Sequence, residues 1–125
     1  MTTAPPPRPE SGPVRTEISV VVEELCDVLT SKLVAALAEV KDPGQVLKWA
    51  RDELKPPDSV EKRLRFAHNI IHKIENAQGR KIAQAWVLSI NPRLAYEAPI
   101  KAIREGKLQE TAAAANALLE HGYDG

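Results

Sequence analysis

Residues 83–106 read AQAWVLSINPRLAYEAPIKAIREG, and this segment is the most informative about the expected fold of the chain. Its first part predicts a helix over residues 80–89, because apolar side chains that include Trp86 recur there at helical spacing. Asn91 and Pro92 end this helix, since a proline disfavours the helical conformation of the residue before it.

A second, shorter helix is expected over residues 99–105. Pro99 suits its first position, and Gly106 suits the position just after its last turn. The chain must turn between the two helices, and we expect Leu94 and Tyr96 to point inward from that turn. The stretch therefore predicts two helices joined by a well-defined turn.

Helical spacing of apolar residues also governs the rest of the chain. Capping residues and prolines mark where each helix begins or stops, so that we expect further helices over residues 17–29, 31–39, 43–54, 59–76 and 108–121. No segment carries the alternating pattern of a strand. The expected fold class is all-α, a small helical bundle.

The helix over residues 59–76 carries a short heptad-like seam. Its apolar positions alternate steps of four and three and comprise Val60, Leu64, Ala67, Ile71 and Ile74. Such a seam can pair two copies of a chain, and it can equally form the core of one chain. The sequence leaves both interpretations open.

Composition narrows the classes of protein that fit. The chain has 125 residues, and 17 basic side chains balance 17 acidic ones, so a nucleic-acid partner would require a local basic patch. The single cysteine, Cys26, forms no internal disulfide and no cysteine-based zinc site.

Residues 1–15 are rich in proline and are expected to form a disordered tail. With no membrane-spanning run and no signal-peptide segment, we expect a cytoplasmic protein without membrane contact.

Residues 31–54 have the layout of a helix-turn-helix, two short helices around a tight turn. Four side chains there could contact the phosphates and a base edge of DNA, namely Gln45, Lys48, Arg51 and Lys55. The three cations are spaced to share one helix face. The alternative is an ordinary solvated surface, since Asp42, Asp52 and Glu53 would repel DNA.

Chemistry on this chain is not expected. His68 and His72 are four residues apart, a spacing that can bring two imidazoles to one metal, but Asn69 stands where a zinc protease has glutamate. The polar face around the two histidines is better explained as a solvated stripe. The sequence has no glycine-rich phosphate loop and no nucleophile in a catalytic setting. We therefore expect that the protein is not an enzyme and that it holds no metal ion and no cofactor.

The order of unlike residues in the C-terminal half is specific. A helix with a tryptophan, an Asn-Pro pair, a leucine, a proline that opens a short helix, and two closing glycines occur as Trp86, Asn91, Pro92, Leu94, Pro99, Gly106 and Gly122. This pattern resembles the toxin-binding domain of Xre/MbcA/ParS-type antitoxins. Upstream, Val46 and Trp49 followed by Pro56 resemble the Xre-like helix-turn-helix that precedes this domain in the family.

The resemblance implies a helix-turn-helix region over residues 16–57 and a toxin-binding domain over residues 58–125. It further implies the antitoxin of a type II toxin–antitoxin system, which neutralises a RES-type, NAD-degrading toxin by covering its active site. The helix-turn-helix would bind operator DNA as a homodimer or a larger complex and repress its own operon, and the toxin would alter this binding. The contact surface for the toxin would lie in the region of the last two helices and at the C-terminal end, with four candidate cations: Arg93, Lys101, Arg104 and Lys107.

Other functions stay open at this point. A stand-alone helix-turn-helix regulator without a toxin would use Lys48 and Arg51 in the same way. The chain could also be a structural or adaptor protein whose helix-turn-helix no longer has a role. The equal numbers of acidic and basic side chains are compatible with this alternative. Each of the four C-terminal cations also has the alternative of ordinary solvated charge.

Overall fold

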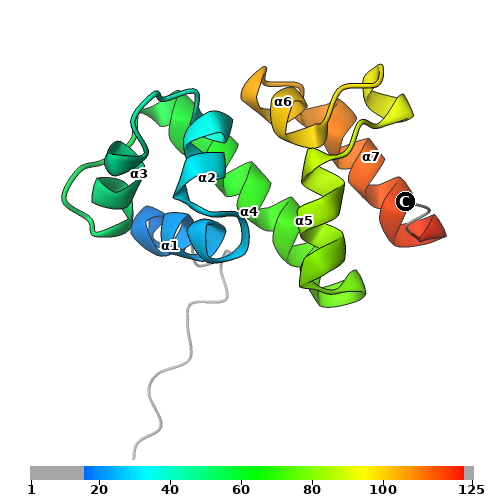
Figure 1. The fold of residues 1–125 in the computed structure, drawn as a ribbon, viewed down its shortest axis with the longest axis horizontal. Coiled ribbons are helices and arrows are strands. Elements are labelled where there is room, and N and C mark those ends of the chain that lie inside the picture. Colours follow the sequence, from blue (N-terminus) through cyan, green and yellow to red (C-terminus); the bar gives the residue numbers. More distant parts are fainter. Residues whose placement is uncertain (1–15, 123–125) are drawn as a thin grey trace, which may run out of the picture.

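The computed structural model describes residues 16–122, so the predicted proline-rich tail over residues 1–15 lies outside the described residues. Within this range the chain folds into α-helices and one 3-10 turn, without a strand. Figure 1 shows the elements in order: α1 (Ile18–Leu29), α2 (Ser31–Ala38), α3 (Pro43–Ala50), α4 (Asp58–Gln78), α5 (Arg80–Leu88), η1 (Pro92–Leu94), α6 (Pro99–Arg104) and α7 (Leu108–His121). The predicted all-α bundle is confirmed.

Local chemistry explains where the short N-terminal helices begin. The hydroxyl of Thr30 accepts a hydrogen bond from the Leu33 amide at 3.3 Å, so Thr30 caps α2. The carboxylate of Asp42 accepts from the Gly44 amide at 2.9 Å, and Pro43 fills the first position of α3. These caps fix the two helices that the sequence predicted as a helix-turn-helix.

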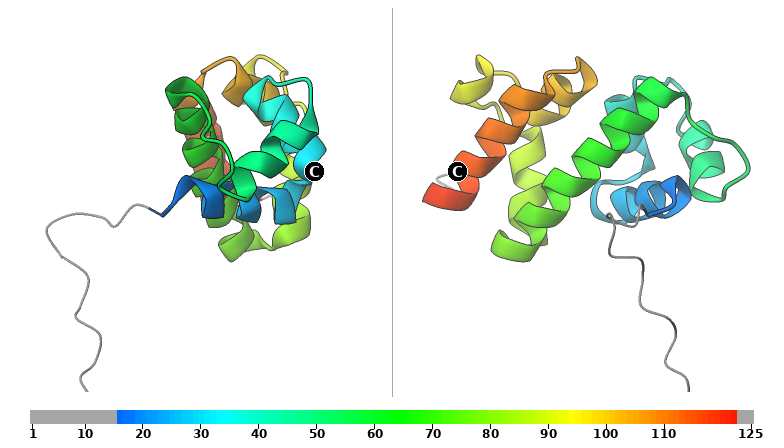
Figure 2. Two further views of the ribbon diagram at one scale, coloured as in Figure 1. Left: turned by 90° about the vertical axis from the view of Figure 1, so that its left-hand side faces the viewer. Right: turned by 180° about the vertical axis from the view of Figure 1, so that it is seen from behind.

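The long helix α4 forms the centre of the molecule. It packs against α1 and α2 on one side and against α5, α6 and α7 on the other (Figures 1 and 2). Every residue of its heptad-like seam is buried within the chain, and Leu64, Ala67 and Ile74 are fully inaccessible to solvent. The seam is therefore core. One cluster of buried residues extends from Trp49 in α3 to Trp86 in α5.

The structure corrects the predicted end of the third helix. The sequence predicted a helix over residues 43–54, but α3 ends at Ala50. Asp52 takes a left-handed conformation with φ 61°, and the Glu53 amide donates to the Lys48 carbonyl at 2.9 Å. A left-handed residue cannot continue a right-handed helix, so the chain turns away here.

The predicted inward orientation of Tyr96 is also wrong, because this side chain is 68 % exposed. Ala95 and Tyr96 both have left-handed backbone conformations, with φ 56° and 65°, so the turn is tighter than spacing alone suggests. Leu94 is buried, as expected.

None of the helices in residues 16–122 is long and apolar enough to cross a membrane.

Candidate functional site

The turn between α5 and α6 is organised by Asn91. Its side-chain oxygen accepts from the Arg93 amide at 2.9 Å, and its backbone carbonyl accepts from the amides of Leu94 and Tyr96, each at 2.9 Å. Its own amide donates to the Glu97 carbonyl at 3.0 Å, which forms an isolated antiparallel bridge. Asparagine serves both as a cap and as the closing residue of the turn. The turn thereby places Arg93 on the surface in a defined position.

Glu97 binds two of the four cations that the sequence proposed for toxin contact. One carboxylate oxygen lies 3.1 Å from Nζ of Lys101, and the other lies 3.1 Å from Nζ of Lys107. Lys107 also lies 3.3 Å from Glu105. Hydrogen bonds from Lys107 and Lys101 hold the pKa of the Glu97 carboxyl below its usual value, and the bond to Glu97 raises the pKa of Lys107. These lysines therefore join the turn, α6 and α7.

The other two candidate cations differ from the lysines. Arg93 is exposed and Arg104 is half-buried at the end of α6. Neither guanidinium makes an ion pair or a hydrogen bond with another of the residues 16–122. The structure thus divides the four predicted residues into two paired lysines and two arginines whose charge is not neutralised within the described part of the chain.

In the N-terminal half, the predicted DNA-contact residues do not all share one helix. Gln45 is half-buried and Lys48 is exposed on α3, whereas Arg51 is the residue that ends this helix. Lys55 lies beyond the helix and pairs with Asp52 at 3.1 Å. The prediction that the cations at 48, 51 and 55 lie on one helix face is therefore wrong for Lys55, because α3 ends four residues too early.

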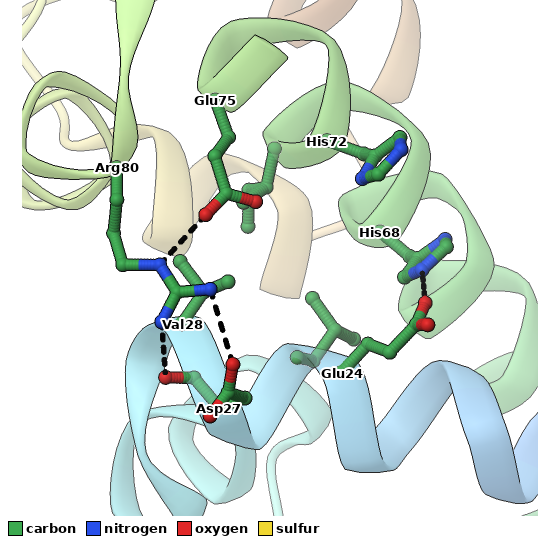
Figure 3. Close-up of a pocket in the computed structure, with 9 residues that line it drawn as sticks. Glu24, Asp27, Val28, His68, His72, Glu75 and Arg80 are labelled. Carbon is green, nitrogen blue, oxygen red and sulfur yellow. Dashed lines mark hydrogen bonds and ion pairs between the residues drawn. The ribbon is translucent and has the colours of Figure 1, made fainter.

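A cavity of about 220 Å³ lies where α1, α4 and α5 meet, and Figure 3 shows the residues around it. Arg80 donates to Glu75 at 2.6 Å and to the carboxylate of Asp27 at 3.0 Å. His68 Nε2 lies 2.6 Å from a carboxylate oxygen of Glu24. These contacts connect the first helix to the last part of α4 and to the start of α5.

The two histidines of this cavity stack on each other. The rings of His68 and His72 are nearly parallel, with centroids 5.8 Å apart. Among residues 16–122, no three histidine, cysteine or carboxylate side chains are grouped so that they could hold a metal ion. The histidine face of α4 is not simply a solvated stripe, since His68 joins it to α1. Sequence reasoning missed this contact because its partner Glu24 is 44 residues away.

The described helices define a small all-α fold with a central long helix. This fold recurs in a chain of the crystal structure of the M. tuberculosis MbcT–MbcA toxin–antitoxin complex, with a TM-score of 0.72 and 21 % sequence identity. The superposition covers 87 % of the present chain and 99 % of that chain. The resemblance seen in the sequence is thus confirmed at the level of the fold. No model of a known protein family matches the sequence, and no curated protein matches it.

Proposed function

We propose that this chain is the antitoxin of a toxin–antitoxin pair and that it neutralises a protein toxin by direct binding. One observation carries the proposal: the fold corresponds over almost the whole length of a chain found in a toxin–antitoxin complex. The order of residues in the C-terminal sequence pattern supports the proposal independently, since Asn91 and Pro92 form the turn that places Arg93 at the surface.

The surface for the toxin comprises the turn, α6 and the start of α7. Arg93 and Arg104 are its primary contact residues, because no partner within residues 16–122 neutralises them. Guanidinium groups suit such contacts, since they bind carboxylates in a planar, bidentate arrangement. Lys101 and Lys107 contribute to this surface mainly through their ion pairs with Glu97, which hold the turn against both helices.

The toxin in this proposal is of the RES type and degrades NAD, as the sequence resemblance implies. Binding would cover its active-site cleft, so neutralisation requires no chemistry on the antitoxin. In the described part of the chain, the polar side chains of Arg80 and His68 join helices to one another.

The N-terminal helices add operator binding to the proposal, with the chain acting as a homodimer that represses its own operon. Lys48 and Arg51 support this role, because both are exposed and neither has an ion-pair partner among the described residues. Gln45 would approach a base edge from the first turns of α3. The same surface would serve the second candidate function, a transcriptional regulator that has no toxin.

Co-expression with the product of the neighbouring gene tests the binding claim. Only the neighbour carries an affinity tag, and the mass of the eluted material gives the stoichiometry. We expect this chain to elute with the neighbour in a defined ratio, and we expect the neighbour alone to stop growth. A harmless neighbour that does not retain the chain would favour the regulator instead.

A further inference from the structure

A surface groove of about 370 Å³ lies between α7 and the segment that joins α5 to η1. Its volume is in the lower part of the range of about 300–1,000 Å³ that is usual for binding pockets. Trp86 and Leu118, both buried, form its base, and Ile90 and Arg93 stand on one wall. The groove is separate from the Glu97 cluster of ion pairs.

The groove exists because α7 offers small side chains along this face. Ala114 and Ala117 lie three residues apart on the helix and both line the groove. Larger side chains at these positions would fill the space above Trp86. The run of alanines in α7 thus has a structural consequence beyond helix formation.

The chemistry of the lining specifies an apolar and anionic occupant. Ile90 is 71 % exposed, so its apolar side chain is available to a partner at the groove. Arg93 and His121 supply the ionisable groups, and no carboxylate among residues 16–122 lines the groove. Glu120, which lies 3.9 Å from His121, is the nearby acidic group on α7 itself.

The exposure of Ile90 also distinguishes a segment of a protein from an enclosed small molecule. A wall that extends this far into solvent would leave a small ligand largely uncovered, whereas a protein segment would cover the wall from outside. Arginine is enriched among the residues that contribute most of the binding energy at protein interfaces, and Arg93 lines the same groove as the exposed Ile90.

We propose that this groove receives an acidic segment of the toxin, with one apolar side chain seated over Ala114 and Ala117 and a neighbouring carboxylate paired with Arg93. The inference rests on the proposed antitoxin function and adds an anchor point to it. Binding buries Ile90 together with the apolar side chain of the partner. Arg93 then fixes the register of the segment, as charge pairs at interfaces do.

Two pairs of variants test the groove, with the product of the neighbouring gene as the probe. Ala117→Trp fills the groove, and Ala113→Trp places the same side chain on an exposed position of α7 that does not line it. Arg93→Glu reverses the charge of the wall, and Lys81→Glu is the matched reversal on the exposed surface of α5. Far-UV circular dichroism checks folding, and calorimetry or interferometry gives Kd.

We expect Ala117→Trp and Arg93→Glu each to weaken binding by at least about tenfold, and both controls to bind within about twofold of the parent chain. If the parent binds the toxin and all four variants bind equally well, the groove proposal is overturned while the antitoxin function stands. If the parent does not bind, both are overturned. If Ala117→Trp changes only the oligomeric mass of the chain alone, the occupant is a second copy and the proposal is also wrong.

Discussion

The Nζ atom of Lys107 lies 3.1 Å from Oε1 of Glu97, so a lysine that the sequence offers for contact with a partner is already held within the chain. The same carboxylate holds Lys101 through its other oxygen. Glu97 also accepts the bond that closes the turn at Asn91. One residue therefore determines both the shape of this surface and the distribution of its charge.

Glu97→Gln should lower the thermal midpoint Tm at neutral pH, because it removes the negative charge that pairs with two ammonium groups. A carboxyl whose pKa is lowered on folding stabilises the folded state above its unfolded pKa, and this contribution is lost as the pH falls through the folded pKa. The Tm difference between parent and variant should therefore shrink below about pH 4.3, the ordinary value for glutamate. Thermal unfolding followed by circular dichroism from pH 7 to pH 2.5 measures it.

Glu53→Gln is the control for this experiment, since Glu53 is exposed and makes no ion pair with the described residues. Its Tm should follow that of the parent at every pH. A Tm difference for Glu97→Gln that is independent of pH would contradict the ion-pair account of this turn.

The two classes of cation should differ in their effect on toxin binding. Arg104→Ala is expected to raise Kd about tenfold, because this arginine has no partner within residues 16–122 and is available to a carboxylate of the toxin. Lys101→Ala should raise Kd only a few-fold, because Lys101 is engaged with Glu97. Titration calorimetry with the purified toxin measures both. Equal effects would mean that the internal ion pairs open on binding.

The helices could be predicted from sequence because the signals that define them are local. Thr30, Asp42, Pro43 and Pro99 mark the starts of helices, and the structure places each at such a position. The all-α class follows from the same signals. The end of α3 could not be predicted, since it depends on Asp52 taking a left-handed conformation that no sequence pattern requires.

The candidate site was predictable only in part, because charge pairing is set by the fold. Lys107 and Glu97 are ten residues apart and meet only once the turn and α6 have brought them together. Arg80 and Asp27 are 53 residues apart and connect the two halves of the chain. The sequence therefore identified which residues are cationic, and the structure was needed to determine which of them are already paired.

The two tryptophans provide a test of the shared core. Trp49 in α3 and Trp86 in α5 belong to one buried cluster. Trp49→Phe leaves Trp86 as the tryptophan that reports on the C-terminal half, and Trp86→Phe leaves Trp49 for the N-terminal half. In each variant we expect the fluorescence and circular dichroism transitions in urea to coincide. Adding Leu64→Ala, at a fully buried position of α4, should destabilise both variants by about 2–5 kcal/mol. Two separate transitions would show instead that the halves unfold independently.

Operator binding should depend on α3 and on the residue that ends it. The double variant Lys48→Ala with Arg51→Ala should bind operator DNA more weakly and should reduce the slope of log K against log salt concentration by roughly 2, one for each phosphate contact. Lys55→Ala should change the slope less, because Lys55 lies beyond the helix and pairs with Asp52. Fluorescence anisotropy over a salt series measures the slope. An unchanged slope in the double variant would remove α3 as the DNA-contact element.

The decisive test of the proposed antitoxin function is the cellular NAD content during induction of the neighbouring gene, measured with and without this chain. We predict that NAD falls when the toxin is expressed alone and stays at the uninduced level when this chain is expressed with it. The combined variant Ala117→Trp with Arg104→Ala should protect less at equal protein levels. If NAD falls to the same extent in the presence of the parent chain, the chain does not neutralise that toxin, and the account is wrong.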